Sequence, residues 1–77
     1  MNNQFKELVA TVLKVDASTL NESSNSSNTE NWDSLMHWEI IAVVEQKYNI
    51  DFTMDEAVEF ENLGGIFNSL IEKGLIK

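Results

Sequence analysis

The stretch NTENWDSLMHWEII, at residues 28–41, is where a polar run gives way to a helical pattern of apolar residues. Asp33 is a favourable N-cap, because its carboxylate can accept hydrogen bonds from the free backbone N–H groups of a first helical turn. Ser34 would then be the first helical residue, beside the positive end of the helix dipole. Six other serines occur in the chain, and most of them fall in the polar run. Ser34 is therefore placed differently from the rest, although an Asp-Ser pair alone is a common capping pattern.

Apolar spacing predicts three amphipathic helices, at about residues 3–14, 34–48 and 62–73. Each has an apolar stripe that we expect to face a common core. The stripes are Phe5, Leu8, Val9, Val12 and Leu13 in the first helix, His37, Ile40, Ile41, Val44 and Tyr48 in the second, and Leu63, Ile66, Phe67, Leu70 and Ile71 in the last. The last helix is expected to end near Gly74, which can adopt the left-handed conformation typical of helix ends.

A short fourth helix is predicted at about residues 54–60. Thr53 is followed three residues later by Glu56, which is a capping-box pattern at a helix start. Ile50 and Phe52 are expected to point inward from the loop that precedes this helix. No run with the alternating pattern of a β-strand stands out.

The connection from Val15 to Asp33 is long and rich in Ser, Asn and Thr. Val15 and Leu20 are expected to anchor it, whereas residues 22–31 are expected to be solvated and mobile. A single helix cannot bury its own apolar stripe, so this connection must lie within one domain. We therefore expect an all-α fold, a small bundle of three main helices plus one short helix, with a long first loop.

Composition narrows the classes of partner. Thirteen acidic residues against five basic ones give a net charge of −8, and this disfavours binding to nucleic acid or to anionic lipid. The excess acid either keeps a small domain in solution or steers it toward basic patches on protein partners. The chain has no Cys, no signal-peptide pattern and no apolar run of the roughly 20 residues that a membrane span needs. We expect a cytoplasmic monomer.

The order of motifs resembles that of the acyl carrier protein family, the phosphopantetheine-binding carriers. Members carry Asp-Ser-Leu at the start of the second helix, then an aromatic-small-Ile step, a short third helix and a fourth helix with Gly in its first turn. The corresponding segments are Asp33-Ser34-Leu35, YNIDF at 48–52, TMDEAVEF at 53–60 and ENLGGIFNSLIEKG at 61–74. The resemblance spans essentially the whole chain, so it implies a single carrier domain at residues 1–77.

This resemblance implies that Ser34 accepts a 4′-phosphopantetheine arm from coenzyme A, through a separate Mg²⁺-dependent phosphopantetheinyl transferase. The arm ends in a thiol that holds an acyl or aminoacyl cargo as a thioester, so a chain without Cys can carry one. The protein itself would be non-catalytic. Its other partners would be a cargo-loading ligase or synthetase and downstream acyl-transfer or condensing enzymes. The expected recognition residues are Asp33, Leu35, Met36, Trp38, Glu39, Ala42 and Glu45.

Two departures from the family pattern concern the residues around Ser34. Met36 stands where fatty-acid carriers commonly have an acidic residue. The Trp-Asp-Ser-Leu form is more similar to discrete carriers of specialised pathways, including surface polysaccharide and aminoacyl systems. Trp32 and Trp38 either complete the core or flank the arm.

The same residues also suggest other functions. Ser34, His37 and Asp33 contain the residue types of a hydrolase triad. Asp33 is adjacent to Ser34 and poorly placed to orient the ring, so we expect a hydrogen-bonded structural His37 and no catalytic residue. The acidic residues between 51 and 59 lack the spacing of a calcium loop, so no metal is expected. The remaining alternative is an unmodified helical adaptor that binds protein partners through an acidic second helix.

Overall fold

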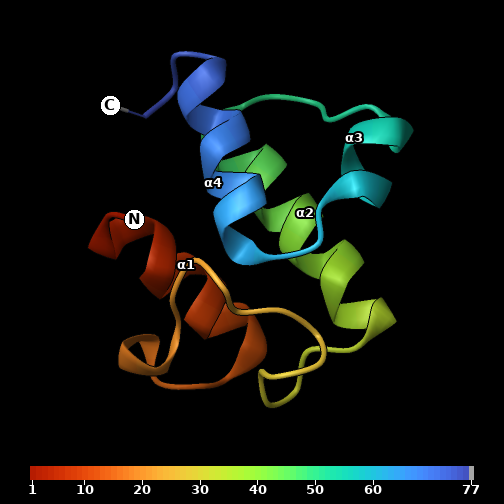
Figure 1. The fold of residues 1–77 in the computed structure, drawn as a ribbon. Helices are drawn as coiled ribbons and strands as arrows, with labels where there is room; N and C mark the ends of the chain where they lie inside the picture. The colour runs from red at the N-terminus through yellow and green to blue at the C-terminus, as the bar shows by residue number, and fades with distance from the viewer. Residues whose placement is uncertain (77) are drawn as a thin grey trace.

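The computed structural model describes residues 1–76, and this part of the chain contains helices and no strand (Figure 1). The elements are α1 (Asn3–Leu13), the short 3-10 helix η1 (Ala17–Thr19), α2 (Ser34–Tyr48), α3 (Met54–Glu59) and α4 (Leu63–Glu72). The prediction of a small bundle with three main helices, one short helix and a long first loop is confirmed. None of these helices is long and apolar enough to cross a membrane.

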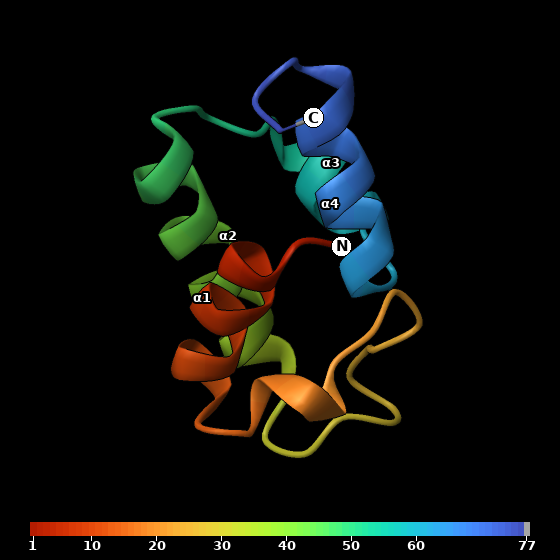
Figure 2. The same cartoon turned by 90° about the vertical axis from the view of Figure 1, so that its left-hand side faces the viewer.

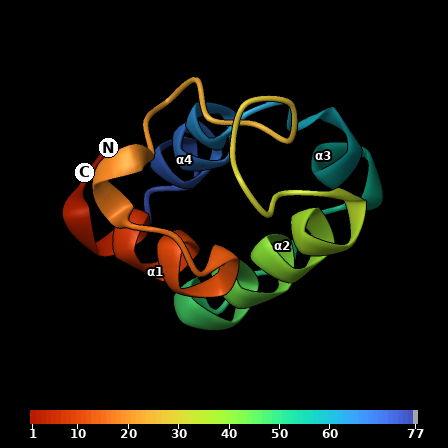
Figure 3. The ribbon, with the colours of Figure 1, turned by 90° about the horizontal axis from the view of Figure 1, so that it is seen from below.

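The core lies between α1, α2 and α4. Figure 2 shows α1 and α2 on one side of the bundle and α3 and α4 on the other, and Figure 3 shows the same arrangement from below. The rings of Phe5 and Phe67 meet with their centroids 5.2 Å apart, which joins α1 to α4. The other fully buried large side chains are Val9, Leu13, Leu20, Ile40, Val44, Leu63, Ile66 and Leu70. Most of the predicted stripes are therefore core residues.

The prediction is wrong for the last residue of the α4 stripe, Ile71, which is 41% exposed. The chain reverses just after α4 at Gly74, whose φ of 77° is the left-handed conformation expected there. Ile76 then returns to the core, and Ala10 is buried although it lies outside the predicted stripe. His37 and Tyr48 are half-buried at the edge of the core rather than inside it.

The predicted helix caps are confirmed. The Asp33 carboxylate accepts the Met36 backbone N–H at 2.9 Å, and Ser34 is the first residue of α2. Thr53 and Glu56 form both hydrogen bonds of a capping box at the start of α3. Each cap joins residues only three positions apart, so it forms as the helix forms and sets where the helix begins.

The long loop is anchored to the start of α4, so the expectation that all of residues 22–31 are solvated is wrong. Ser24 is buried, and its carbonyl accepts the Leu63 N–H at 2.8 Å. The Glu22 carbonyl accepts the Gly64 N–H at 3.0 Å. The first N–H groups of a helix have no acceptor within the helix, and here the loop supplies two. The contact is made across the fold, where local sequence patterns give no signal.

This close contact predicts different effects of alanine at two adjacent glycines. A Cβ on Gly64 would lie 2.9 Å from the Glu22 carbonyl oxygen, whereas a Cβ on Gly65 would make only ordinary contacts. We expect Gly64→Ala to lower the free energy of unfolding by about 1–3 kcal/mol, because the backbone of the loop must move. Gly65→Ala should be neutral or stabilising by up to about 1 kcal/mol. Urea unfolding of both variants measures the difference, and equal effects would contradict the loop–helix contact.

Candidate functional site

Ser34 lies exposed at the first position of α2, directly after an extended N-cap. The Asp33 cap accepts the Met36 N–H, two residues after Ser34, and Ser34 itself is exposed to solvent. The first turn of α2 contains no acidic residue. The free N–H groups and the dipole of a helix start favour a negatively charged group at such a position.

The segment leading to Ser34 is fixed by α1. Asn31 adopts a left-handed conformation with a φ of 69°, and its side-chain amide donates to the Leu13 carbonyl at 2.8 Å. Trp32, the next residue, is 4% exposed and belongs to the core. The chain is thus tied to the end of α1 three residues before Ser34, and to the core two residues before it. This contact holds the start of α2 in place.

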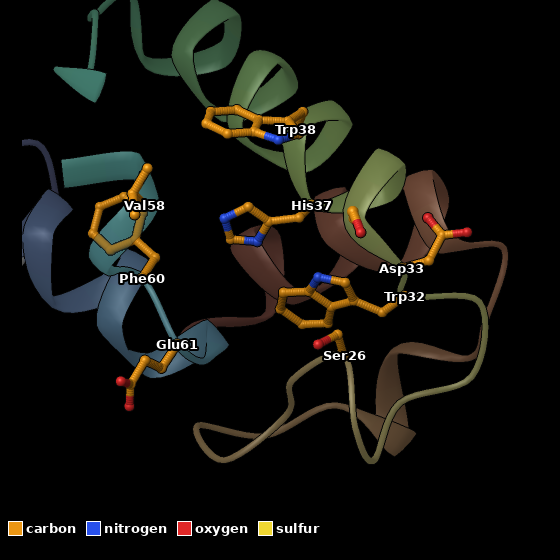
Figure 4. A pocket seen from close by; sticks show the side chains of 9 residues that line it. Ser26, Trp32, Asp33, His37, Trp38, Val58, Phe60 and Glu61 are labelled. Atoms are coloured by element: carbon orange, nitrogen blue, oxygen red, sulfur yellow. The ribbon is translucent and has the colours of Figure 1, made fainter. Parts of the chain in front are cut away.

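Ser34 also lines a surface pocket of about 360 Å³, shown in Figure 4. Its walls come from the first loop, the start of α2, and α3 with the two residues that follow it. The lining residues are Ser26, Trp32, Asp33, Ser34, His37, Trp38, Val58, Phe60 and Glu61. Those outside residues 32–38 were missed by sequence reasoning, because no local pattern indicates that the first loop and α3 meet at α2.

His37 connects α2 to α3. Its Nε2 lies 3.1 Å from the Ala57 carbonyl oxygen, which can only accept, so Nε2 carries the hydrogen and donates it. The imidazole is stacked on Trp32, with centroids 6.3 Å apart, and meets Trp38 edge-on at 5.8 Å. The expectation of a hydrogen-bonded structural histidine is confirmed. With Nε2 engaged by α3 and Asp33 capping Met36, these groups are not arranged as a hydrolase triad.

The hydrogen bond from His37 predicts a measurable loss when it is removed. His37→Phe keeps an aromatic ring between the tryptophans but leaves the Ala57 carbonyl without its donor. We expect the free energy of unfolding to fall by about 1–3 kcal/mol, and the amides of α3 to exchange faster with solvent. Hydrogen exchange measured by NMR tests this, with the exposed Glu39→Gln as control. Unchanged exchange in α3 of His37→Phe would show that the bond does not hold this helix.

The two tryptophans have different roles. Trp32 completes the core, as one of the two expectations had it. Trp38 does not, since it is 43% exposed and its ring faces the pocket in Figure 4. A large aromatic side chain left partly in solvent beside Ser34 is available to contact a ligand or a partner.

The other expected recognition residues divide into two groups. Leu35, Glu39 and Ala42 are exposed along one face of α2, at i, i+4 and i+7, and Asp33 is exposed at its start. Met36 and Glu45 are half-buried. Met36 packs against the core, and the Glu45 carboxylate accepts the Phe52 backbone N–H at 2.7 Å. Glu45 therefore makes a hydrogen bond within the bundle that the sequence pattern did not indicate.

The carboxylate of Glu56 ties the start of α3 to the residue that follows α4. The Glu56 carboxylate accepts the Thr53 N–H and lies 3.1 Å from the Lys73 ammonium on the residue after α4. The hydrogen bond from the Thr53 backbone, followed by the contact with Lys73, lowers the pKa of Glu56 below its usual value. Lys73 also sits over the Phe52 ring, 5.8 Å from its centroid. These contacts fix the helix that supplies Val58 to the pocket. Within residues 1–76, no group of three or more His, Asp or Glu side chains is placed to hold a metal ion.

Comparison with known proteins extends over most of the chain. Residues 3–70 match the family described as PP-binding, phosphopantetheine attachment site. The chain is 30% identical, over 66 residues, to the acyl carrier protein of Chlamydia caviae, and the aligned part covers 86% of each chain. The matched range 3–70 contains every residue that lines the pocket, Ser34 included.

Proposed function

The chain belongs to the acyl carrier protein family, the phosphopantetheine-binding carriers, and on this basis we propose that Ser34 carries the 4′-phosphopantetheine arm. Proteins of this family are non-catalytic carriers with covalently attached 4′-phosphopantetheine. They interact with a phosphopantetheinyl transferase and with acyl-processing enzymes. The bound arm supplies the thiol on which a cargo is held as a thioester.

The observation that carries this proposal is the position of Ser34. Among the serines of residues 1–76, it alone begins an α-helix, and its side chain is exposed. Ser24, by contrast, is buried. A phosphate on the Ser34 oxygen would lie at the positive end of α2, an interaction worth about 0.3–1 kcal/mol at an exposed site. The residues present therefore fit the prosthetic group.

The exposed face of α2 supports a second part of the proposal, the recognition of partner enzymes. Leu35 and Ala42 would make apolar contacts next to the arm, while Asp33 and Glu39 would pair with Lys or Arg on the partner. The net charge of −8 favours basic partner surfaces. We assign a cargo-loading ligase or synthetase and downstream acyl-transfer or condensing enzymes as the partners. Met36 and Glu45, with their contacts inside the bundle, contribute less.

The remaining parts of the proposal concern domain organisation, oligomeric state and cellular location. The helices share one core, which supports a single carrier domain over residues 1–77. We infer a cytoplasmic monomer, because a chain without Cys fits a reducing compartment and a net charge of −8 disfavours self-association. The alternative of an unmodified adaptor is not favoured by the family match.

Incubation of the purified protein with coenzyme A, Mg²⁺ and a broad-specificity phosphopantetheinyl transferase tests the proposal. Intact-protein mass spectrometry should show a gain of one phosphopantetheine, and a reaction without coenzyme A should show none. No gain with several transferases would contradict the carrier function. The adaptor would then be the function to pursue, through protein partners of α2.

A further inference from the structure

The pocket beside Ser34 is lined in part by apolar side chains that nothing else within residues 1–76 covers. Trp38 on α2 is 43% exposed and Val58 on α3 is 66% exposed, and both line this pocket. A folded chain gains by burying such side chains, so two of them facing one hollow from different helices indicate a binding surface.

Aromatic rings form one side of the pocket. Figure 4 shows Trp38, His37 and Trp32 one above another along α2 and the loop before it, with Val58 and Phe60 across from them. The ring contacts of His37 with both tryptophans fix this wall, and its hydrogen bond to Ala57 fixes the distance to the opposite side. The pocket is therefore formed before any ligand arrives.

Polar atoms occupy defined places in the same pocket. Because His37 Nε2 donates to Ala57, the Nδ1 of the neutral ring is a hydrogen-bond acceptor. The hydroxyl of Ser26 lines the pocket from the first loop. Asp33 and Glu61 also line it, and their negative charges disfavour an anionic ligand. The suitable occupant is thus uncharged, with apolar groups and a few hydrogen-bonding groups.

The volume of the pocket and the position of Ser34 in its lining indicate which ligand it binds. At about 360 Å³, the pocket is near the lower limit for small-molecule sites, too small for a whole arm with a long cargo. Ser34 is itself a lining residue, so a group attached to it has a high effective concentration there. The part of the arm next to the phosphate is the pantoyl unit, which is neutral and has two geminal methyl groups, a hydroxyl and an amide.

We propose that the pocket of Trp38, Val58 and His37 binds the pantoyl unit of the arm, an inference that rests on attachment at Ser34. The geminal methyl groups contact the Trp38 ring and the Val58 side chain. The hydroxyl and amide are matched by His37 Nδ1 and the Ser26 hydroxyl. The phosphate stays outside, at the start of α2. Trp38 is then a positioning residue that sets the direction in which the thiol end leaves the protein.

NMR of the carrier with its arm attached tests this directly. Isotope-labelled protein is modified with unlabelled coenzyme A, and complete modification is verified by mass. We expect nuclear Overhauser contacts from the geminal methyl protons of the arm to the Trp38 ring and to the Val58 methyl groups. The chain has two tryptophans, so its two indole N–H signals are readily assigned, and the Trp38 signal should shift on modification.

Three variants separate effects of the pocket from general effects. Trp38→Ala should remove the arm contacts to Val58, and Val58→Ala should weaken those to Trp38. Met54→Ala is the matched control, because Met54 is a similarly exposed apolar residue of α3 that does not line the pocket, and it should leave all contacts in place. If the NMR spectrum of Trp38→Ala is not that of a folded protein, the contacts measured in Val58→Ala decide whether the arm lies in the pocket.

The outcomes distinguish this inference from the proposed function. Failure to attach the arm would refute both. Attachment with shifts confined to residues 33–36, and no contact from the arm to Trp38 or Val58, would refute the pocket alone. Contacts made by the thiol end or by a loaded cargo instead of the geminal methyl groups would also overturn the proposal. So would a Trp38 shift that appears only when the transferase is present, since the pocket would then belong to a partner.

Discussion

Ser34→Ala is expected to abolish attachment of phosphopantetheine completely while the fold stays intact. The substitution removes one exposed hydroxyl at the start of α2, and alanine is a favourable helical residue. The free energy of unfolding should therefore change by no more than about 0.5 kcal/mol. Intact-protein mass after treatment with transferase and coenzyme A measures the first effect, and urea unfolding measures the second.

Ser27→Ala is the matched control for this experiment. Ser27 is an exposed serine of the first loop that does not line the pocket, and its loss should leave the mass gain unchanged. A mass gain retained by Ser34→Ala would contradict the assignment of the attachment site. A mass gain lost in Ser27→Ala would show that the loop, rather than the start of α2, governs modification.

Trp32→Ala is expected to lower the free energy of unfolding by about 3–5 kcal/mol, as truncation of a buried aromatic side chain commonly does. Trp32 is 4% exposed, belongs to the core and stacks on His37. Such a loss is a large part of the roughly 5–15 kcal/mol that stabilise a natural domain. Denaturant unfolding should show a partly unfolded population without denaturant or a much lower midpoint.

Trp38→Ala provides the comparison, because the same side chain is removed from an exposed position six residues later in the chain. We expect a loss within about 1 kcal/mol, as for most surface substitutions. Equal destabilisation by the two variants would contradict the distinction between a core tryptophan and a pocket tryptophan. It would also remove the reason for assigning Trp38 to the arm.

The parts of the fold that could be predicted are those set by neighbouring residues. Asp33 and Thr53 act on N–H groups three residues away, and apolar stripes repeat along a single helix. The helix starts, the all-α fold and the position of Ser34 at the start of α2 therefore follow from local sequence. The family resemblance adds what local chemistry cannot, the identity of the group that a serine in this position receives.

The parts that escaped prediction depend on contacts between distant segments. His37 and Ala57 are twenty residues apart, and the Glu22 carbonyl meets an α4 amide across the fold. The internal hydrogen bond of Glu45 and the exposure of Ile71 likewise depend on how a loop or a turn returns to the bundle. The pocket is a product of these contacts, so its residues from α3 and the first loop carry no signal in helical periodicity.

The most direct test of the central claim is to locate the arm within the modified protein by fragmentation mass spectrometry. The chain contains seven serines, and sequential fragments can separate Ser34 from the six others. We predict that the whole mass increment lies on Ser34 and that no fragment without this residue carries it. An increment on any other residue, or no increment under conditions that modify a known carrier, would contradict the claim.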